Sequence, residues 1–93
     1  MSVEFEWDPV KAAANLRKHG VAFEEAVTAF ADSLSLTIPD PLHSQGELRF
    51  VLLARSRAGR MLAVVHAERG DTIRLIGPRV ATRKERKAYE ENT

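Results

Sequence analysis

Residues 48–77 decide the fold, and they read LRFVLLARSRAGRMLAVVHAERGDTIRLIG. Three apolar stretches within them have the length and composition of β-strands: residues 48–55, 61–67 and 72–77. The connections between these stretches are short and contain Gly59 and Gly70, which favours tight turns. Pro78 is expected to close the third strand, because proline cannot donate a hydrogen bond to a strand ladder. The segment therefore predicts an antiparallel meander of three strands.

The residues before the meander predict a short strand followed by two helices. Apolar and acidic side chains alternate over residues 3–7, as in a strand with one buried face. Asp8 and Pro9 form a typical helix start, and Gly20 is expected to end that helix after His19. A second, amphipathic helix is predicted from apolar side chains at helical spacing: Phe23, Ala26, Val27 and Phe30.

The rest of the chain adds an irregular segment and one helix. Residues 32–46 contain prolines and a glycine, and the only order expected there is a possible short strand at residues 34–38. Thr82 and Glu85 form a capping box for a last helix that reaches about Glu91. The order of elements predicts an α+β fold with an antiparallel sheet of three to five strands, two N-terminal helices and one C-terminal helix. All helices are expected on one face of that sheet.

The composition narrows the class of protein. A chain of 93 residues is predicted to form a single domain, residues 1–93. It contains no cysteine, which excludes disulfides, thiolate catalysis and cysteine-ligated zinc. Its three histidines lack metal-ligand spacing such as H-E-x-x-H, so neither a metal nor a cofactor is expected. The first residues are acidic where a signal peptide is basic, and no apolar run approaches about 18 residues. A cytoplasmic protein without a membrane span is therefore expected.

The charge is divided between the two halves of the chain. Residues 1–48 carry three basic and eight acidic side chains, a net charge of −5, whereas residues 49–93 carry eleven basic and five acidic side chains, a net charge of +6. Nine of these eleven basic side chains are arginines, whose planar fork suits phosphate groups. We therefore expect the C-terminal half to contact a polyanion, although a solvated surface produces the same division.

Motifs along nearly the whole chain form an ordered set. In the N-terminal half they are Phe5-Glu6-Trp7-Asp8-Pro9, Lys11-Ala12, Asn15, Lys18-His19-Gly20-Val21, Phe23-Glu24-Glu25-Ala26, Asp40, His43-Ser44 and Glu47. In the C-terminal half they are Arg49, Gly59-Arg60, Val64-Val65, Ile73-Arg74-Leu75-Ile76, Arg79, Ala81-Thr82, Glu85-Arg86 and Tyr89-Glu90. The set resembles the BrnT family of toxins. Each motif is weak alone, but their order makes the resemblance specific.

This resemblance implies a RelE-like fold and a ribonuclease toxin of a type II toxin–antitoxin pair. It also implies a cognate, BrnA-like antitoxin that binds the toxin directly, carries a DNA-binding module and forms a hetero-oligomer with it. The family usually has a serine and a small residue before the arginine at Arg79, where this chain has Gly77-Pro78. This departure leaves an alternative open, a non-catalytic subunit of the toxin family that engages an antitoxin.

Arginines of the C-terminal half are the candidates for phosphate binding. RNA is cleaved without a metal when its own 2′-hydroxyl attacks the neighbouring phosphate, and this reaction needs cations around the developing charge. Arg49 and Arg74 have apolar strand neighbours, so both are expected to project from the open face of the sheet. Arg79 lies at a strand end before the capped helix, and the resemblance favours a catalytic role for it. A solvated sheet surface is the alternative for Arg49 and Arg74.

His43 and Glu47 are the candidates for catalytic proton transfer. Histidine exchanges protons near neutral pH, and a nearby carboxylate can orient it or act as the base. A spacing of four residues would bring the two together on a helix, but the surrounding prolines and Gly46 argue against a helix there. A loop histidine and a glutamate that leads into a strand fit the spacing equally well. His19 and His66 are expected at a helix C-terminus and in the core, respectively.

A basic cluster on the last helix is a candidate RNA-binding surface. It consists of Arg83, Lys84, Arg86 and Lys87, and Arg60 is a further candidate. A solvated helix surface is an equal alternative for the cluster. A helix-turn-helix DNA reader is rejected, because its recognition helix would begin at Phe23 with two glutamates that repel phosphates.

Overall fold

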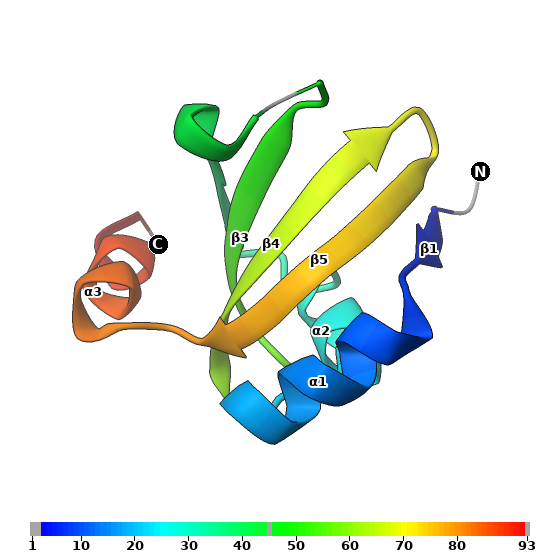
Figure 1. The fold of residues 1–93 in the computed structure, drawn as a ribbon. Coiled ribbons are helices and arrows are strands. Elements are labelled where there is room, and N and C mark those ends of the chain that lie inside the picture. Colours follow the sequence, from blue (N-terminus) through cyan, green and yellow to red (C-terminus); the bar gives the residue numbers. More distant parts are fainter. Residues whose placement is uncertain (1–2, 45, 93) are drawn as a thin grey trace.

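The computed structural model describes residues 3–44 and 46–92. It contains every helix and strand expected from the sequence, arranged as a five-stranded sheet between helices (Figure 1). In chain order the elements are β1 (Glu4–Glu6), α1 (Pro9–His19), α2 (Phe23–Ala29), β2 (Leu36–Pro39), the 3-10 turn η1 (Pro41–His43), β3 (Arg49–Arg55), β4 (Met61–Arg69), β5 (Thr72–Val80) and α3 (Arg83–Asn92). No helix within the described residues is long and apolar enough to cross a membrane.

The strands of the sheet follow the order β1-β5-β4-β3-β2. β3, β4 and β5 form the antiparallel meander that the sequence predicts, and β2 joins it antiparallel to β3. β1 runs parallel to β5, with Phe5 beside Ile73, so the sheet is mixed and the antiparallel expectation fails at this edge. No hairpin turn joins β1 to β5, because most of the chain lies between them, and their relative direction is therefore not forced to be antiparallel.

Helices cover both faces of the sheet because both faces are apolar. α1 and α2 pack on one face, where Phe23 belongs to the same core cluster as Leu52. α3 packs on the other face, here called the α3 face, where Tyr89 meets Leu53 and Ala63. Neighbouring residues of a strand point to opposite faces, so the buried pair Leu52 and Leu53 needs a cover on each side. The expectation that all helices share one face is therefore wrong.

A β-bulge in β5 determines which side chains reach the α3 face. The pairing of β5 with β4 shifts by one residue between Val65 and His66, which leaves Ile76 without a partner on β4. Arg74 and Arg79 are five residues apart, a spacing that places side chains of a regular strand on opposite faces. The extra residue cancels one step of this alternation. Both arginines therefore lie on the α3 face.

β5 continues to Val80, so the expectation that Pro78 closes it is wrong. Pro78 pairs with Val64, and its carbonyl accepts a hydrogen bond of 2.8 Å from the side chain of Asn15 on α1. The backbone groups of Pro78 thus point away from β4, where the missing N–H breaks no ladder hydrogen bond. β1 does not reach this far, since its pairing with β5 ends at Glu6. α1 therefore takes the place of a strand along this part of the β5 edge.

Capping side chains define the ends of α1 and α3. Asp8 Oδ1 accepts a hydrogen bond of 2.9 Å from the N–H of Val10, and Gly20 ends α1 with a φ of 71°. At α3, the Thr82 N–H donates to Glu85 Oε1 at 2.9 Å and the Glu85 N–H donates to Thr82 Oγ1 at 3.2 Å. This reciprocal pair confirms the predicted capping box.

Candidate active site

A row of three side chains crosses the open end of the α3 face. The strand register places Ala67 between Arg49 and Arg74, on a line across β3, β4 and β5. Ala67 is fully buried, whereas each of the two arginine side chains keeps 34% of its surface exposed. The buried Ala67 thus separates two partly exposed arginines on neighbouring strands. The expectation that Arg49 and Arg74 project from one face of the sheet is confirmed.

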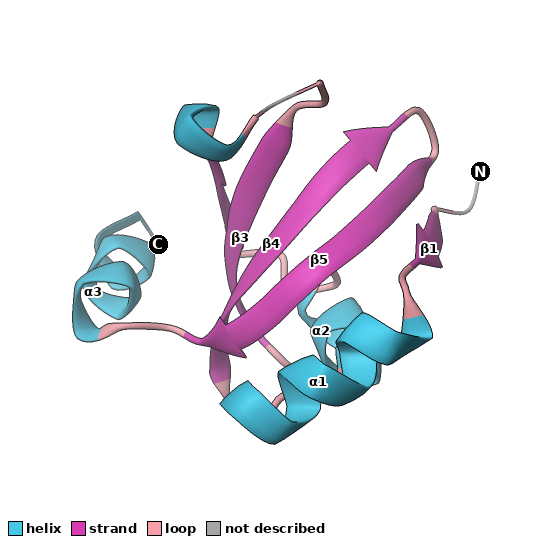
Figure 2. Ribbon diagram, in the orientation of Figure 1, coloured by secondary structure: helices cyan, strands magenta, loops and turns pink. Residues whose placement is uncertain are grey.

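A short loop brings a histidine to this row. η1 lies beside the start of β3 (Figure 2). The Asp40 N–H donates to the Arg49 carbonyl at 2.9 Å, and the Arg49 N–H donates to Ser44 Oγ at 2.9 Å. Ser44 Oγ itself donates to the Asp40 carbonyl at 2.7 Å. These hydrogen bonds fix the turn that carries His43 against the strand end that carries Arg49.

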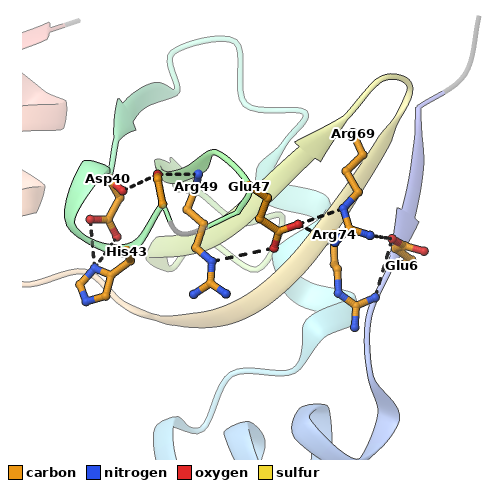
Figure 3. Close-up of polar contacts among 8 residues, drawn as sticks. Glu6, Asp40, His43, Glu47, Arg49, Arg69 and Arg74 are labelled. Atoms are coloured by element: carbon orange, nitrogen blue, oxygen red, sulfur yellow. Dashed lines mark hydrogen bonds and ion pairs between the residues drawn. The ribbon is translucent and has the colours of Figure 1, made fainter.

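His43 is paired with Asp40, and the possible pair with Glu47 does not form. The two carboxylate oxygens of Asp40 lie 3.0 and 2.9 Å from His43 Nδ1. A carboxylate at Nδ1 fixes the ring and favours the tautomer whose Nε2 can accept a proton. The His43 side chain is 68% exposed, so a substrate can reach it. Glu47 points away from His43 (Figure 3).

Glu47 is held on its other side by arginines (Figure 3). Its Oε2 accepts a hydrogen bond of 3.0 Å from Arg69 Nε and a second one from Arg69 Nη2, while its Oε1 lies 4.0 Å from Arg49 Nε. The hydrogen bonds from Arg69 lower the pKa of Glu47. A lower pKa makes a carboxylate a weaker proton acceptor. The geometry therefore favours a holding role for Glu47 over the role of a base.

The ion pairs continue from β4 to β1. Arg69 Nη1 and Arg74 Nη1 lie 3.8 and 3.7 Å from the same oxygen of Glu6. Positive and negative side chains thus alternate in one chain of contacts: Arg49, Glu47, Arg69, Glu6 and Arg74. This alternation keeps three cations close together on one surface without direct repulsion.

Sequence reasoning alone does not single out three contributors to this cluster: Asp40, Arg69 and Glu6. Asp40 and Glu6 are part of the motif set, but no spacing rule connects them to His43 or Arg74. Arg69 is assigned to a turn by the sequence, whereas β4 extends to it. The available signal was the strand alternation, because Arg69 lies two residues beyond Ala67 and therefore on the same face.

Arg79 and Arg60, two further candidates, are bound in ion pairs that hold the fold together. Arg79 Nη1 and Nη2 donate to the two carboxylate oxygens of Glu85 at 2.7 and 2.9 Å. This pairing is the main cause that lowers the pKa of Glu85 from 4.5 to about 2. Arg60 donates from Nε to Glu25 at 2.9 Å and from Nη2 to the Gly20 carbonyl at 3.0 Å. These guanidinium groups join α3 to β5 and the start of β4 to α2.

The basic residues of α3 form a separate surface. All four candidates on this helix are exposed: Arg83, Lys84, Arg86 and Lys87. A hollow of about 640 Å³ is lined by three of them together with Ala81 and Glu90. No member of the row of Arg49, Ala67 and Arg74 lines this hollow. The structure therefore does not bring the helix cluster and the row together.

The remaining histidines lie outside the cluster. His66 is 1% exposed and its Nδ1 lies 3.0 Å from the Val64 carbonyl, which confirms the prediction of a satisfied core residue. His19 lies exposed in the last turn of α1, as expected. Over residues 3–44 and 46–92, no three histidine, aspartate or glutamate side chains form a group that could hold a metal ion.

Gly77 and Pro78, where this chain differs from the residues usual in the family it resembles, face α1. A Cβ atom added at Gly77 would lie 3.3 Å from Asn15 Oδ1, closer than most contacts of this kind. The same Asn15 side chain donates to the Pro78 carbonyl. The residues at positions 77 and 78 therefore affect the contact between β5 and α1.

The match with a known family covers most of the chain. A sequence profile of the family described as "Ribonuclease toxin, BrnT, of type II toxin-antitoxin system" matches residues 7–85. The chain belongs to the BrnT family. The matched segment includes His43, Glu47 and both arginines of the row, but not Glu6. This BrnT protein is thus an endoribonuclease toxin, with RNA as its substrate and an antitoxin as its partner.

A solved BrnT structure has a similar fold. The crystal structure of the Brucella abortus ribonuclease toxin, BrnT, matches with a TM-score of 0.62 and 20% sequence identity, over 88% of this chain and 100% of that chain. At this level of identity the likeness shows the fold alone. A comparison with curated protein sequences finds no match.

Proposed function

We propose that this BrnT protein cleaves RNA without a metal ion, by attack of the ribose 2′-hydroxyl on the neighbouring phosphate. The observation that carries the proposal is the juxtaposition of His43, oriented by Asp40, with Arg49 and Arg74 on one open sheet face. The attack needs a proton acceptor and cations in one place, and these side chains supply both.

Arg49 and Arg74 bind the scissile phosphate in this proposal. Both side chains keep 34% of their surface exposed, and their contacts with carboxylates are long, at 4.0 Å from Arg49 to Glu47 and 3.7 Å from Arg74 to Glu6. Both guanidinium groups therefore keep donors for phosphate oxygens, and both stay charged at physiological pH. The phosphorane carries more negative charge than the phosphate that precedes it. The two arginines therefore stabilise the transition state more than the bound substrate.

His43 takes the proton of the 2′-hydroxyl. Its Nδ1 is occupied by Asp40, so the proton goes to Nε2 on the exposed side of the ring. The 2′-oxygen then forms a bond to phosphorus, and the bond from phosphorus to the 5′-oxygen breaks. The leaving 5′-oxygen takes a proton from water, and the hydroxide that remains takes the proton from His43 Nε2, so water and neutral His43 are restored. The products are a 2′,3′-cyclic phosphate and a 5′-hydroxyl.

Two residues with an expected catalytic role act indirectly in this proposal. The hydrogen bonds of Arg79 with Glu85 support a role in fixing α3, and those of Glu47 with Arg69 support a role in holding Arg69. The cations Arg83, Lys84, Arg86 and Lys87 contact phosphates farther along the RNA, where exposure on α3 favours such contacts. The pairing of Arg60 with Glu25 supports a structural role for that arginine.

Cleavage in EDTA tests the mechanism. The purified protein is incubated with single-stranded RNA, and the new ends are analysed. The wild type is expected to yield 2′,3′-cyclic phosphate ends, whereas Arg49→Ala and His43→Ala should lose most of the rate. Arg57→Ala is the matched control, because it removes an exposed arginine of the turn between β3 and β4. RNA that stays intact in EDTA, or that ends in 3′-hydroxyl groups, contradicts the mechanism.

We further propose a BrnA-like antitoxin with a DNA-binding module, which forms a hetero-oligomer with this toxin in the cytoplasm. The toxin–antitoxin character of the family supports such a partner. Expression of the toxin alone should arrest growth, and coexpression with a short neighbouring reading frame should relieve the arrest. Copurification of the two proteins measures the complex. A neighbouring product that relieves the arrest without binding the toxin contradicts this part of the proposal.

A further inference from the structure

We propose that Arg69 is a third phosphate-binding arginine of the site and that Glu47 is the positioning residue that aims it. This inference rests on the proposed function and extends it. Arg69 is the last residue of β4 and pairs with Thr72 at the end of the hairpin. It lies two positions beyond Ala67 on the same face, so it flanks the row that holds Arg49 and Arg74.

The contacts of Arg69 leave part of its guanidinium group available. Nε and Nη2 both donate to Glu47 Oε2, whereas Nη1 lies 3.8 Å from Glu6, beyond hydrogen-bond distance. The side chain is 53% exposed, so a phosphate can approach the Nη1 side. Glu47 thus holds the Nε and Nη2 edge of Arg69, while Nη1, on the side of Glu6, remains available for a phosphate.

Two hydrogen bonds to one carboxylate oxygen give Arg69 a defined direction. A long, half-exposed arginine at a hairpin end otherwise samples many rotamers, and ordering it costs conformational entropy. An exposed ion pair adds little to stability by itself, so alignment is the main consequence of this contact. Glu47 lies two residues before the start of β3 and is therefore itself placed by the strand that carries Arg49.

The charges of the cluster match a phosphodiester. Three arginines and two glutamates make up the chain of contacts, which gives a net charge of +1: Arg49, Arg69, Arg74, Glu6 and Glu47. A phosphodiester carries one negative charge, so binding it would bring the net charge of the cluster to zero. Glu6 is the carboxylate that a phosphate would displace, because both of its ion pairs are long, at 3.8 and 3.7 Å.

A double-mutant cycle on binding and cleavage tests this inference. The variants are Arg69→Gln, Arg69→Lys, Glu47→Gln and the combination of Arg69→Gln with Glu47→Gln, and Arg57→Gln is the charge-matched control. Binding is measured with 2′-O-methyl RNA, which cannot be cleaved, over a range of salt concentrations. Cleavage of ordinary RNA is measured in single turnovers at saturating protein. Thermal unfolding verifies that each variant is folded.

Arg69→Gln should reduce the slope of log affinity against log salt by about 0.7, the value of one phosphate contact to a single strand. Arg69→Lys should keep the slope, because the charge remains, but cleave more slowly. Glu47→Gln should bind RNA at least as tightly as the wild type, because a negative charge is removed, and yet cleave more slowly. In the Arg69→Gln background, Glu47→Gln should have no further effect on the rate.

A wild-type salt slope in Arg69→Gln would overturn the inference, since Arg69 would then be a surface ion pair only. Rate losses that multiply in the double variant would overturn the role of Glu47, since it would then act on RNA independently of Arg69. A wild type that cleaves no RNA in EDTA would refute the proposed mechanism. The salt slopes would still decide whether Arg69 contacts phosphate, so the two failures are distinguishable.

Discussion

The covered and open ends of the α3 face use arginine for different tasks. At the covered end, Arg79 donates two hydrogen bonds of 2.7 and 2.9 Å to Glu85. At the open end, Arg74 on the same strand and the same face has a 3.7 Å contact with Glu6. Glu85 is fixed by the capping box of α3, whereas Glu6 lies on a three-residue edge strand. An arginine with an anchored partner holds the fold, and an arginine with a distant, shared partner remains available for a ligand.

Substitutions at the open end should give the largest effect and should act on activity. Arg49→Ala or Arg74→Ala is expected to lower the single-turnover rate of RNA cleavage by about 100- to 1000-fold, the range for losing one group that stabilises a developing oxyanion. Stability should change by less than about 1 kcal/mol, because both side chains are partly exposed and weakly paired. Rapid-quench cleavage assays and thermal unfolding measure the two quantities. If the melting temperature also fell far enough for unfolding to explain the lost activity, the arginines at the two ends of the α3 face would not have different tasks.

Substitutions in the dyad of His43 and Asp40 should have the next largest effect on the cleavage rate. His43→Ala is expected to slow cleavage roughly 100-fold or more, as for the loss of a proton acceptor. Asp40→Asn should cost less, because the ring remains while its orientation weakens. Both variants should bind uncleavable RNA like the wild type, which gel-shift titration measures. Equal losses of binding and rate would instead assign His43 to substrate binding.

Arg79→Ala should show the opposite pattern, with a loss of stability. A partly exposed bidentate pair lies between exposed and buried ion pairs, so we expect a loss of about 1–2 kcal/mol. For a domain of this size, that corresponds to a decrease of roughly 4–15 °C in melting temperature. Cleavage at 25 °C should fall less than about tenfold. If activity fell as far as in Arg49→Ala while the melting temperature was unchanged, Arg79 would be the catalytic arginine that the sequence suggests.

Tyr89→Phe isolates one polar contact of the covered end. Tyr89 Oη donates a hydrogen bond of 2.7 Å to Asp32 Oδ2, which also accepts the N–H of Arg55 at 2.9 Å. Removing the hydroxyl should cost about 1 kcal/mol, since the ring still packs against Leu53. The expected change in melting temperature is roughly 4–8 °C, without a change in cleavage. Scanning calorimetry would reveal a larger loss if the hydroxyl organised the whole end of the sheet.

Acid should gradually remove the stabilisation that the Arg79–Glu85 pair provides. The pKa of Glu85 is about 2 in the folded protein, against 4.5 without its partners. The stabilising contribution is therefore complete above pH 4.5, declines as the pH falls from 4.5 to 2, and is lost below that window. The gap in melting temperature between the wild type and Arg79→Ala should narrow over this range. A gap that stays constant down to pH 2 would show that packing, and not charge, holds α3.

The sequence predicts the elements of this fold well, because their signals are local. Asp8 and Gly20 bound α1, and Thr82 with Glu85 starts α3, as capping rules predict. The direction of β1 and the second covered face were not predictable in this way. The first depends on a pairing between segments far apart in the chain. The second depends on α3, whose one buried residue in the described chain, Tyr89, gives a weak apolar signal.

The candidate site was predicted in part, for similar reasons. Arg49 and Arg74 follow from their place in apolar strands. The partners of His43 and Glu47 do not follow, because the loop geometry directs His43 to Asp40 and Glu47 to Arg69. Carboxylates from other segments decide which arginines are held by close hydrogen bonds and which have only long ion pairs. Sequence spacing contains no information on these contacts.

Because Ile76 is an extra residue in β5, odd-numbered and even-numbered side chains exchange faces of the sheet between the two ends of this strand. In a relative whose β5 lacks this extra residue, two arginines can share one side of the sheet only when they lie an even number of positions apart. If evolution adds or removes one codon between Arg74 and Arg79, the β-bulge must be gained or lost with it for both arginines to stay on one face. Length variation between the two arginines is thus tied to backbone shape.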